Sequence, residues 1–336
     1  MPSPSSESVQ DYYETGSGEE TTLAENEQAW RSIRFRPRVL RDVGEVTTGL
    51  NLLGTRLAAP FLVAPTALHG LAHPDGESST ALGVAAAESL LVLSTRSSRP
   101  LEEVAASAAG RWWFQVYAMR MRRLTLRLAQ DAAAAGATAL VLTGDTPTVG
   151  RKHRSTPDLD PAEHHLRTLR ERIGEDLTAE DIAQDPTADS SLIDSLRSAT
   201  GLPVLVKGVL RADDAEAMLA AGAAGLIVSN HGGRQLDRAL PTAEALPAVI
   251  AVAGGAPVLV DGGIRGGLDA LAALAIGADA VLVGRPVLRA LSAGGSQAVA
   301  DLLVQYGREL REAMTLAGAR DLGGLSRDLV VLPHER

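Results

Sequence analysis

The sequence predicts an α/β protein with the architecture of a (β/α)8, or TIM, barrel. From residue 60 onward, short apolar runs alternate with alanine-rich stretches of helical pattern, and polar residues or glycines follow most of the runs. A run of three or four apolar, partly β-branched residues is too short for a helix and is typical of a strand buried on both faces. Eight such runs occupy residues 61–64, 90–93, 113–116, 139–142, 204–206, 226–228, 258–260 and 280–283.

Helices are expected between these runs. Eight strand–helix units with parallel pairing and right-handed crossovers favour a barrel, because closure leaves no free sheet edge. A doubly wound sheet is the weaker alternative, since no Gly-x-Gly-x-x-Gly follows an early run. The expected helices lie near residues 76–88, 101–108, 122–135, 211–221, 243–253, 266–276 and 286–293, and a final helix lies near 297–316.

Two segments lie outside the barrel pattern but within a single domain of residues 1–336. Residues 1–58 are predicted to form an N-terminal helical extension, and residues 152–201 an insertion after the fourth strand. A barrel of this kind occupies about 250 residues, so this chain has room for both additions. The charges between Arg167 and Asp181 favour a mobile lid, although a plain solvated helix pair is an equal alternative.

The composition excludes several kinds of chemistry and partner. The chain has no cysteine, which excludes disulfides, thiolate catalysis and cysteine-ligated metals, and we assign no metal site. Its 32 Lys and Arg against 41 Asp and Glu give a formal net charge of −9, which disfavours nucleic acid as a partner. No apolar run approaches the roughly 20 residues of a membrane span, and the first residues lack a signal-peptide pattern. We therefore expect a cytoplasmic protein without a membrane partner.

The sixth run ends in the polar motif that carries the clearest chemistry. Residues 225–228 are apolar, and Ser-Asn-His-Gly-Gly-Arg follows directly, so a buried strand delivers His231 and Arg234 to an open edge. Histidine exchanges a proton near neutral pH, and arginine offers a permanent forked cation for a carboxylate or phosphate. For this motif alone, a turn with a solvated histidine and arginine has about equal weight.

Residues after the other runs are expected at the same rim. Those after the first four runs are mostly neutral hydrogen-bonding groups, which suit a flat heterocycle. The loops after the last two runs carry glycine next to arginine, a pattern that suits a phosphate. Lys207 lies in the barrel wall and needs an anionic partner, which a reduced flavin would supply. These rim residues are Pro65, Thr66, Ala67, Ser94, Gln115, Tyr117, Thr143, Asp145, Lys207, Ser229, Asp261, Gly262, Gly263, Arg265, Gly284 and Arg285.

Several motifs, taken together, resemble those of one enzyme family. They are Asp11-Tyr12-Tyr13, Leu23-Ala24-Glu25-Asn26, Ala64-Pro65-Thr66-Ala67, Asp145-Thr146-Pro147, the stretch 229–237, Asp261-Gly262-Gly263 and Gly284-Arg285-Pro286. Over essentially its whole length the chain is similar to the FMN-dependent 2-hydroxyacid oxidase and dehydrogenase family. The resemblance implies a barrel that binds FMN and oxidises a 2-hydroxy acid to the 2-oxo acid. It also implies O2 or another electron acceptor, and a homotetramer.

The resemblance implies a role for each matching residue. His231 would be the catalytic base, Asp145 would orient it and stabilise its protonated form, and Lys207 would stabilise the anionic reduced flavin. The substrate carboxylate and hydroxyl would be bound by Tyr12, Tyr117, Lys152, His231 and Arg234. The remaining cofactor contacts would come from Pro65, Thr66, Ala67, Ser94, Gln115, Thr143, Ser229, Asp261, Gly262, Gly263, Arg265, Gly284 and Arg285.

The chain departs from the family pattern around the expected substrate pocket. Lys152 stands where the family usually has a second carboxylate-binding arginine, and Arg96 and Gly144 stand where an apolar or aromatic residue is more usual. The resemblance therefore leaves open an FMN barrel of another reaction class, such as an isomerase or an enzyme that oxidises a larger substrate. A phosphate-binding barrel without redox chemistry is the third possibility.

Overall fold

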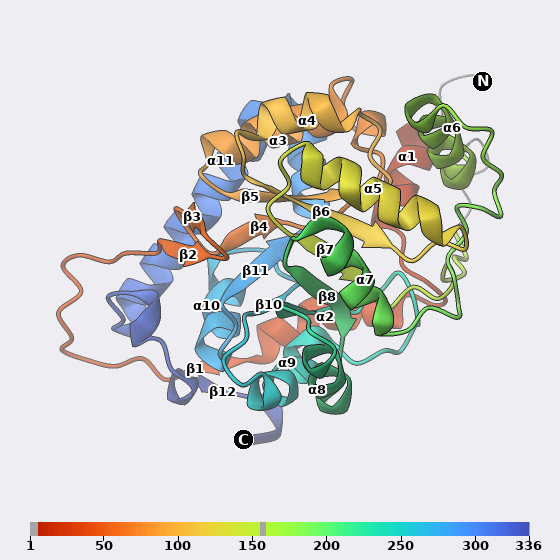
Figure 1. Ribbon diagram of the computed structural model, residues 1–336. Helices are drawn as coiled ribbons and strands as arrows, with labels where there is room; N and C mark the ends of the chain where they lie inside the picture. Colours follow the sequence, from red (N-terminus) through yellow and green to blue (C-terminus); the bar gives the residue numbers. More distant parts are fainter. Residues whose placement is uncertain (1–5, 155–158, 336) are drawn as a thin grey trace.

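The computed structural model describes residues 6–154 and 159–335, and its centre is a closed barrel of parallel strands ringed by helices (Figure 1). The barrel strands are β4 (Phe61–Val63), β5 (Leu90–Ser94), β6 (Trp112–Tyr117), β7 (Leu140–Thr143), β8 (Val204–Val209), β9 (Gly225–Val228), β10 (Val258–Val260) and β11 (Ala280–Val283). The barrel closes where β11 pairs with β4, with Val281 opposite Phe61 and Val283 opposite Val63. The predicted fold is confirmed.

The helices of the ring follow the strands as the alternation predicts. They are α3 (Gly76–Ala86), α4 (Leu101–Ala108), α5 (Arg122–Ala134), α7 (Ser191–Thr200), α8 (Ala212–Ala220), α9 (Thr242–Val252), α10 (Gly267–Ile276) and α11 (Arg285–Ala317). The last element takes the place of two expected helices, and it bends at Gly294 and Gly295, whose backbone angles are not helical. No helix in the described ranges is both long enough and apolar enough to cross a membrane.

The N-terminal extension carries two helices and three short strands. They are α1 (Ser6–Glu14), α2 (Thr21–Ser32), β1 (Arg34–Phe35), β2 (Leu50–Leu52) and β3 (Thr55–Leu57). Strand β1 pairs antiparallel with β12 (Val330–Val331), which ties the end of the N-terminal extension to the C-terminal segment. Short 3-10 turns complete the fold at η1 (His69–Leu71), η2 (Leu322–Gly324), η3 (Arg327–Leu329) and η4 (Pro333–Glu335).

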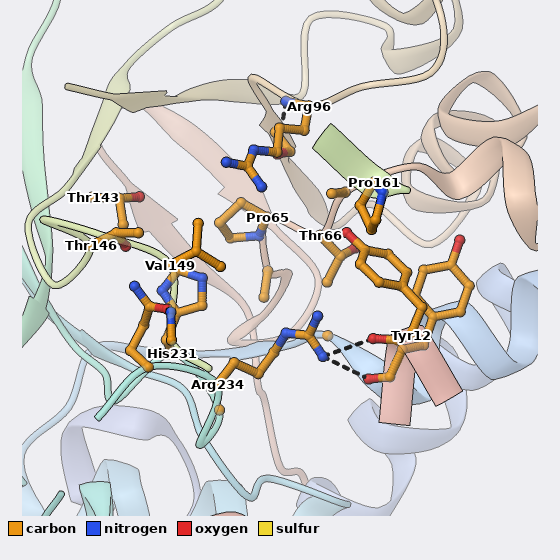
Figure 2. A pocket seen from close by; sticks show the side chains of 18 of the residues that line it. Tyr12, Pro65, Thr66, Arg96, Thr143, Thr146, Val149, Pro161, His231 and Arg234 are labelled. Atoms are coloured by element: carbon orange, nitrogen blue, oxygen red, sulfur yellow. Dashed lines mark hydrogen bonds between the residues drawn. The ribbon is translucent and has the colours of Figure 1, made fainter. Parts of the chain in front are cut away.

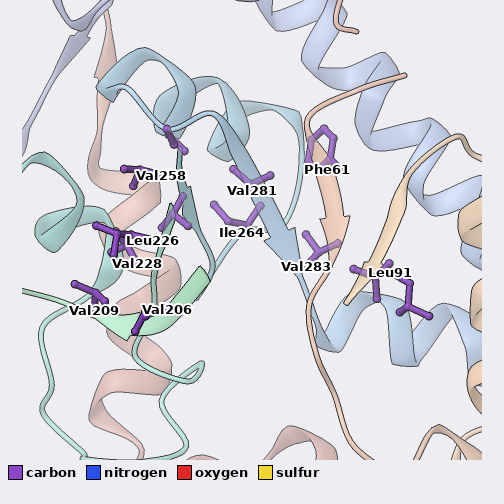
Figure 3. Close-up of a cluster of buried hydrophobic side chains, with 14 of the residues drawn as sticks. Phe61, Leu91, Val206, Val209, Leu226, Val228, Val258, Ile264, Val281 and Val283 are labelled. Carbon is purple, nitrogen blue, oxygen red and sulfur yellow. The ribbon is translucent and has the colours of Figure 1, made fainter. Parts of the chain in front are cut away.

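The barrel wall is apolar on both faces. Successive residues of a strand point alternately into the barrel and out toward the helices, and both environments are buried. Inward residues such as Leu205 and Ile227 form one buried cluster with Leu52 and Leu57 of the β2–β3 hairpin, which closes the end of the barrel where the strands begin. Outward residues pack under the helical ring in a second cluster (Figure 3). The two faces of the wall and the amino end of the barrel are therefore filled by apolar side chains. The carboxyl end of the strands is where polar side chains can meet a ligand.

The insertion after β7 is partly a feature of the ring itself. Residues 155–158 lie outside the described ranges. Helix α6 (Pro161–Ile173) begins at Asp160, whose carboxylate accepts hydrogen bonds from the backbone N–H groups of Ala162 and Glu163, and it ends at Gly174. Helix α7 falls inside the range 152–201 that the sequence suggested as a lid, yet it packs against α5 and β8. The end of the segment before α7 is also attached to the barrel, because the backbone N–H groups of Arg120 and Met121 donate to the carbonyls of Ala183 and Asp181.

The interior cluster predicts where the fold is most sensitive to truncation. Leu205 is completely buried, so Leu205→Ala should lower the free energy of unfolding by about 2–5 kcal/mol through lost burial and a residual cavity. Leu316 on α11 is 72% exposed, so Leu316→Ala should change it by less than about 0.5 kcal/mol. Urea unfolding of both variants tests this, and equal effects would contradict the assignment of Leu205 to the packed interior.

Candidate active site

A cavity of about 600 Å³ opens at the carboxyl end of the barrel strands (Figure 2). This volume lies within the usual range for sites that bind small molecules and cofactors. Two of the predicted site residues, Asp145 and Ser229, do not line it but lie directly behind it. The predicted residues that do line the cavity are Tyr12, Pro65, Thr66, Ala67, Ser94, Gln115, Tyr117, Thr143, Lys152, Lys207, His231, Arg234, Asp261, Gly262, Gly263, Arg265, Gly284 and Arg285.

His231 and Asp145 form a pair across the strand ends. The Nδ1 of His231 lies 3.0 Å from Oδ1 of Asp145, which leaves Nε2 as the ring nitrogen able to exchange a proton with a ligand. Burial alone would raise the pKa of Asp145, but His231 and, more weakly, Lys207 outweigh it, and the pKa is lowered. Asp145 is therefore a carboxylate anion, suited to stabilise a protonated imidazole.

A glycine that sequence reasoning overlooked makes room for this carboxylate. Gly208 has a φ of +111°, and a Cβ at this position would lie 2.5 Å from the Cβ of Asp145. The β8–β9 pairing is irregular between Lys207 and Val209 on either side of this glycine. A residue with a side chain at 208 would displace Asp145, and the dipeptide Lys-Gly gave no local sign of this.

Lys207 is bound by the protein itself. Its Nζ lies 2.9 Å from Oδ2 of Asp261 and donates to Oγ of Ser229, and its side chain is 4% exposed. Burial lowers the pKa of Lys207, but the attraction of Asp261 and Asp145 outweighs burial, and the pKa is raised overall. The ammonium therefore stays charged. The structure confirms that Lys207 has an anionic partner, and this partner is Asp261, a carboxylate two strands away that the local sequence did not point to. The expected contact of Lys207 with a reduced flavin stays a prediction. The other oxygen of Asp261, Oδ1, is buried and has no protein partner in the described structure.

A row of buried polar groups runs along the ends of β5, β6 and β7. Ser94 Oγ donates to Oε1 of Gln115 at 3.2 Å, and Nε2 of Gln115 donates to Oγ1 of Thr143 at 2.9 Å. The backbone N–H of Thr95 also donates to Oε1 of Gln115. These bonds fix the orientation of the Gln115 amide, so the row presents a fixed pattern of donors and acceptors to the cavity.

Thr66 is held from behind by a buried cluster that the sequence did not reveal. Its Oγ1 lies 2.5 Å from Nε2 of His69, and Nδ1 of His69 lies 2.8 Å from Oγ1 of Thr80. Burial lowers the pKa of His69, although Glu77, which accepts from the His69 backbone N–H, opposes the shift. His69 and Glu77 belong to different elements and no motif links them, so only the folded chain shows that they support Thr66.

Two arginines connect the barrel rim to the N-terminal extension. NH1 of Arg234 donates to the backbone carbonyls of Tyr12, Tyr13 and Thr15 at 2.9, 3.3 and 2.8 Å. Arg285 donates to the carbonyls of Tyr13, Thr15 and Gly232. Because carbonyls accept these bonds, both guanidinium charges keep their attraction for an anion.

The rim of the cavity holds more basic side chains than acidic ones to neutralise them. Burial, followed by repulsion from Arg234 and Arg265, lowers the pKa of Arg285 to about 9. Burial, followed by repulsion from Arg234, Arg96 and Arg285, lowers the pKa of Lys152 to about 8. Arg265 is partly compensated by Glu27, at 2.9 Å. Such mutual repulsion is relieved when an anion binds.

Lys152 and Arg154 both line the cavity, but Arg154 is already engaged by acidic residues. Arg154 forms ion pairs with Glu20 at 2.9 Å and Asp11 at 3.3 Å. Arg151 is exposed and does not line the cavity. The basic position closest in role to the arginine expected here is thus Lys152 itself.

Helix α2 packs against the loops that follow β9 and β10 at the edge of the site. Asn26 and Asn230 exchange two side-chain hydrogen bonds of 2.9 and 2.7 Å, and Nε1 of Trp30 donates to the carbonyl of Gly262. A Cβ on Gly263 would lie 2.5 Å from the Asn26 carbonyl oxygen, so this glycine is required by the approach of α2. The motif at residues 23–26 therefore has a packing role, because Asn26 holds α2 against the loops after β9 and β10.

The arrangement fits a flat ring that carries a phosphate. The glycines after β10 and β11 and the uncompensated Arg285 suit a phosphate at one side of the cavity. The amide and hydroxyl row suits the edge of a heterocycle, and the unpaired Oδ1 of Asp261 can accept a hydrogen bond from a ligand hydroxyl. His231 and Arg234 remain for a second, acidic molecule.

Comparisons with known proteins agree with this chemistry. A family model described as FMN-dependent dehydrogenase matches residues 4–332. Glycolate oxidase 1 of Zea mays is 40% identical over 339 residues, which cover 97% of this chain and 92% of that protein. The 4-hydroxymandelate oxidase of Amycolatopsis orientalis is 42% identical, with 94% of this chain and 92% of that protein covered.

Solved structures give the same result. A crystal structure of mandelate oxidase with (S)-4-hydroxymandelic acid superposes with a TM-score of 0.87 at 39% identity, and covers 97% of this chain and 95% of its own. A mandelate oxidase mutant with the monooxide FMN adduct gives a TM-score of 0.84 at 41% identity, with 96% of each chain covered.

The buried pair of Lys207 and Asp261 leads to a prediction about stability. Asp261→Asn leaves a buried ammonium without its counter-charge, so the free energy of unfolding should fall by about 3–5 kcal/mol. Asp213→Asn breaks an exposed pair with Arg211 and should leave the unfolding midpoint nearly unchanged. Urea unfolding of the ligand-free proteins measures both, and a wild-type midpoint for Asp261→Asn would show that Lys207 has another counter-ion.

Proposed function

The chain belongs to the FMN-dependent dehydrogenase family, and on that premise we propose how its residues carry out the reaction. The protein is an FMN-dependent oxidoreductase that converts a 2-hydroxy acid to the 2-oxo acid. The single observation that carries our assignment of roles is the His231–Asp145 pair, which lies at the cavity rim beside the unneutralised Arg234. Nothing at the site favours an isomerase or a larger substrate.

In our proposal His231 is the base. Its Nε2 takes a proton from the substrate, while the Asp145 carboxylate at Nδ1 holds the ring and stabilises the imidazolium that forms. Tyr117 is partly buried, and burial raises the pKa of its hydroxyl, so it remains a neutral donor toward the substrate. Base, anchoring anion and hydrogen-bond donor thus come from three different strand ends.

Arg234 would anchor the substrate carboxylate. Its NH1 is occupied by carbonyls, but no acceptor among the described residues is bonded to its Nε or NH2. Lys152 would add a second charge, and Tyr12 lies beside Arg234, with the guanidinium carbon 5.4 Å from the ring centroid. A carboxylate held in this way presents its α-carbon toward His231.

FMN, when bound, accepts the two electrons that leave the substrate. Lys207 would hold the negative charge of the reduced ring, and Asp261 Oδ1 would accept from a ribityl hydroxyl. The ring and ribityl chain would contact Pro65, Thr66, Ala67, Ser94, Gln115, Thr143 and Ser229. The phosphate would be held by Gly262, Gly263, Arg265, Gly284 and Arg285.

Three further proposals concern the electron acceptor, the assembly and the location of the protein. We propose O2 as the electron acceptor, because the relatives compared above are named oxidases. We propose a homotetramer on the family resemblance alone. We propose a cytoplasmic location on the sequence expectation, while one relative from Oryza sativa is named a peroxisomal (S)-2-hydroxy-acid oxidase.

The assignment of His231 predicts a selective loss of the chemical step. His231→Ala should retain FMN but slow anaerobic reduction of the flavin by a 2-hydroxy acid at least about a hundredfold, because it removes the base. Stopped-flow absorbance measures the rate, and reduction of the same variant by dithionite is the control. A rate close to that of the wild type would remove His231 from its role.

The lowered pKa of Lys152 predicts a pH dependence. Below about pH 8 its ammonium attracts the anionic substrate, and this attraction is lost as the pH rises through that value. The ratio kcat/KM, which reports on the free enzyme, should therefore fall by up to about tenfold between pH 7 and pH 9.5. Lys152→Arg keeps its charge and should flatten this alkaline limb. An alkaline limb of equal size in both proteins would assign it to another group.

A further inference from the structure

Arg96 is a cation in the active-site cavity that the reaction outlined above does not use. It follows β5, lines the cavity, and Figure 2 shows its side chain extending into the pocket from the side opposite Arg234. Its backbone is fixed, since its N–H donates to Oγ of Ser94 and its carbonyl accepts from the N–H of Leu68. The guanidinium therefore occupies the pocket because the loop directs it there.

No acidic group of residues 6–154 or 159–335 forms an ion pair with this guanidinium. Its carbon lies 5.1 Å from the centroid of the Tyr117 ring, which gives a cation–π contact but no counter-charge. Its Nε is buried and has no hydrogen-bond partner in the described structure. A buried, unsatisfied donor on a charged group costs free energy, and a site that keeps one is often completed by a ligand.

The acids in and behind the cavity are already engaged. Asp145 is paired with His231, Asp261 with Lys207, and Asp11 with Arg154. Asp160 accepts from the first turn of α6. Among the described residues, no carboxylate within ion-pair distance is left for Arg96.

The remaining cations match the charges of FMN and one carboxylate without Arg96. Arg265 and Arg285 suit the phosphate, Lys207 the reduced ring, and Arg234 with Lys152 the carboxylate beside the reacting carbon. Arg96 adds to the repulsion that lowers the pKa of Lys152, so it acts on the same cavity. A substrate with a single carboxylate would leave this additional charge uncompensated.

We propose that the substrate is a 2-hydroxy dicarboxylic acid whose second carboxylate is bound by Arg96. This inference rests on the proposed function and names its substrate class. The α-carbon loses its hydrogen and the hydroxyl its proton, two electrons pass to FMN, and the second carboxylate is unchanged. Because Arg96 packs on the ring of Tyr117, the second carboxylate lies on the Tyr117 side of the pocket, away from Arg234.

Matched pairs of acids test the proposal on the FMN-loaded enzyme. Malate is compared with 2-hydroxybutyrate, and 2-hydroxyglutarate with 2-hydroxyvalerate, using both enantiomers of each and anaerobic stopped-flow reduction. Each pair has the same number of carbons and differs in the second carboxylate. We expect at least one dicarboxylate to exceed its partner about tenfold or more in reduction rate divided by dissociation constant.

Variants assign that preference to Arg96. Arg96→Met keeps an unbranched apolar stem and should remove the preference, whereas Arg96→Lys should retain part of it. Arg308→Met removes an exposed arginine of α11 outside the cavity and should leave the preference unchanged. Calorimetric binding of 2-oxoglutarate against 2-oxovalerate gives the same comparison without turnover, and it applies even if a variant reduces its flavin slowly.

The outcomes separate the inference from the function. If the four-carbon and five-carbon monocarboxylates match or exceed the dicarboxylates and Arg96→Met does not alter the ratio, the inference fails while the oxidase function stands. If 3-phosphoglycerate exceeds the monocarboxylates in reduction rate divided by dissociation constant, the dicarboxylates do not, and Arg96→Met removes that excess, then the second anion is a phosphate. The dicarboxylate assignment is then overturned. If none of these acids, nor glycolate, lactate or mandelate, reduces a flavin that dithionite reduces, both proposals fail.

Discussion

The buried pair of Lys207 and Asp261 links the parts of the site to one another. It joins the ends of β8 and β10 across β9, and Ser229 at the end of β9 accepts from Nζ of Lys207 and from the backbone N–H of His231. His231 has a φ of +59°, an unfavourable conformation for a residue with a side chain, so it needs such support. The interaction that keeps an ammonium charged inside the barrel therefore also sets the position of the proposed base.

The N-terminal extension completes the site rather than decorating the barrel. Carbonyls of Tyr12, Tyr13 and Thr15 hold Arg234 and Arg285, and Asn26 is bonded to Asn230. These contacts join residues more than 200 positions apart, and they fix the cations without cancelling their charge. The strand ends carry the reactive and charged side chains, and the carbonyls of the extension orient the guanidinium groups of Arg234 and Arg285.

The sequence predicted what depends on local pattern. Runs buried on both faces, such as 226–228, revealed the strands, and the rule that ligands meet the carboxyl ends of parallel strands brought His231 and Arg234 forward. What it could not show depends on contacts between distant segments. The counter-ion of Lys207 and the support of Thr66 by His69 are set by tertiary neighbours, and neither has a periodic or motif signal. Helix α7 does have a helical pattern, since Leu192, Ile193 and Leu196 form its buried face, but the pattern alone does not tell a ring helix from a lid.

The distribution of charge shows how an acidic protein keeps a cationic site. The chain has a formal net charge of −9, yet Arg285 at the rim is held by neutral carbonyls, and burial together with repulsion from neighbouring arginines lowers its pKa to about 9. Carbonyl dipoles offset part of the cost of desolvating a guanidinium but cannot neutralise it, so the field in the cavity stays positive. A carboxylate in the same place would stabilise the arginine better and would also compete with the ligand. The choice of carbonyl over carboxylate partners thus exchanges some stability of the empty site for affinity toward anions.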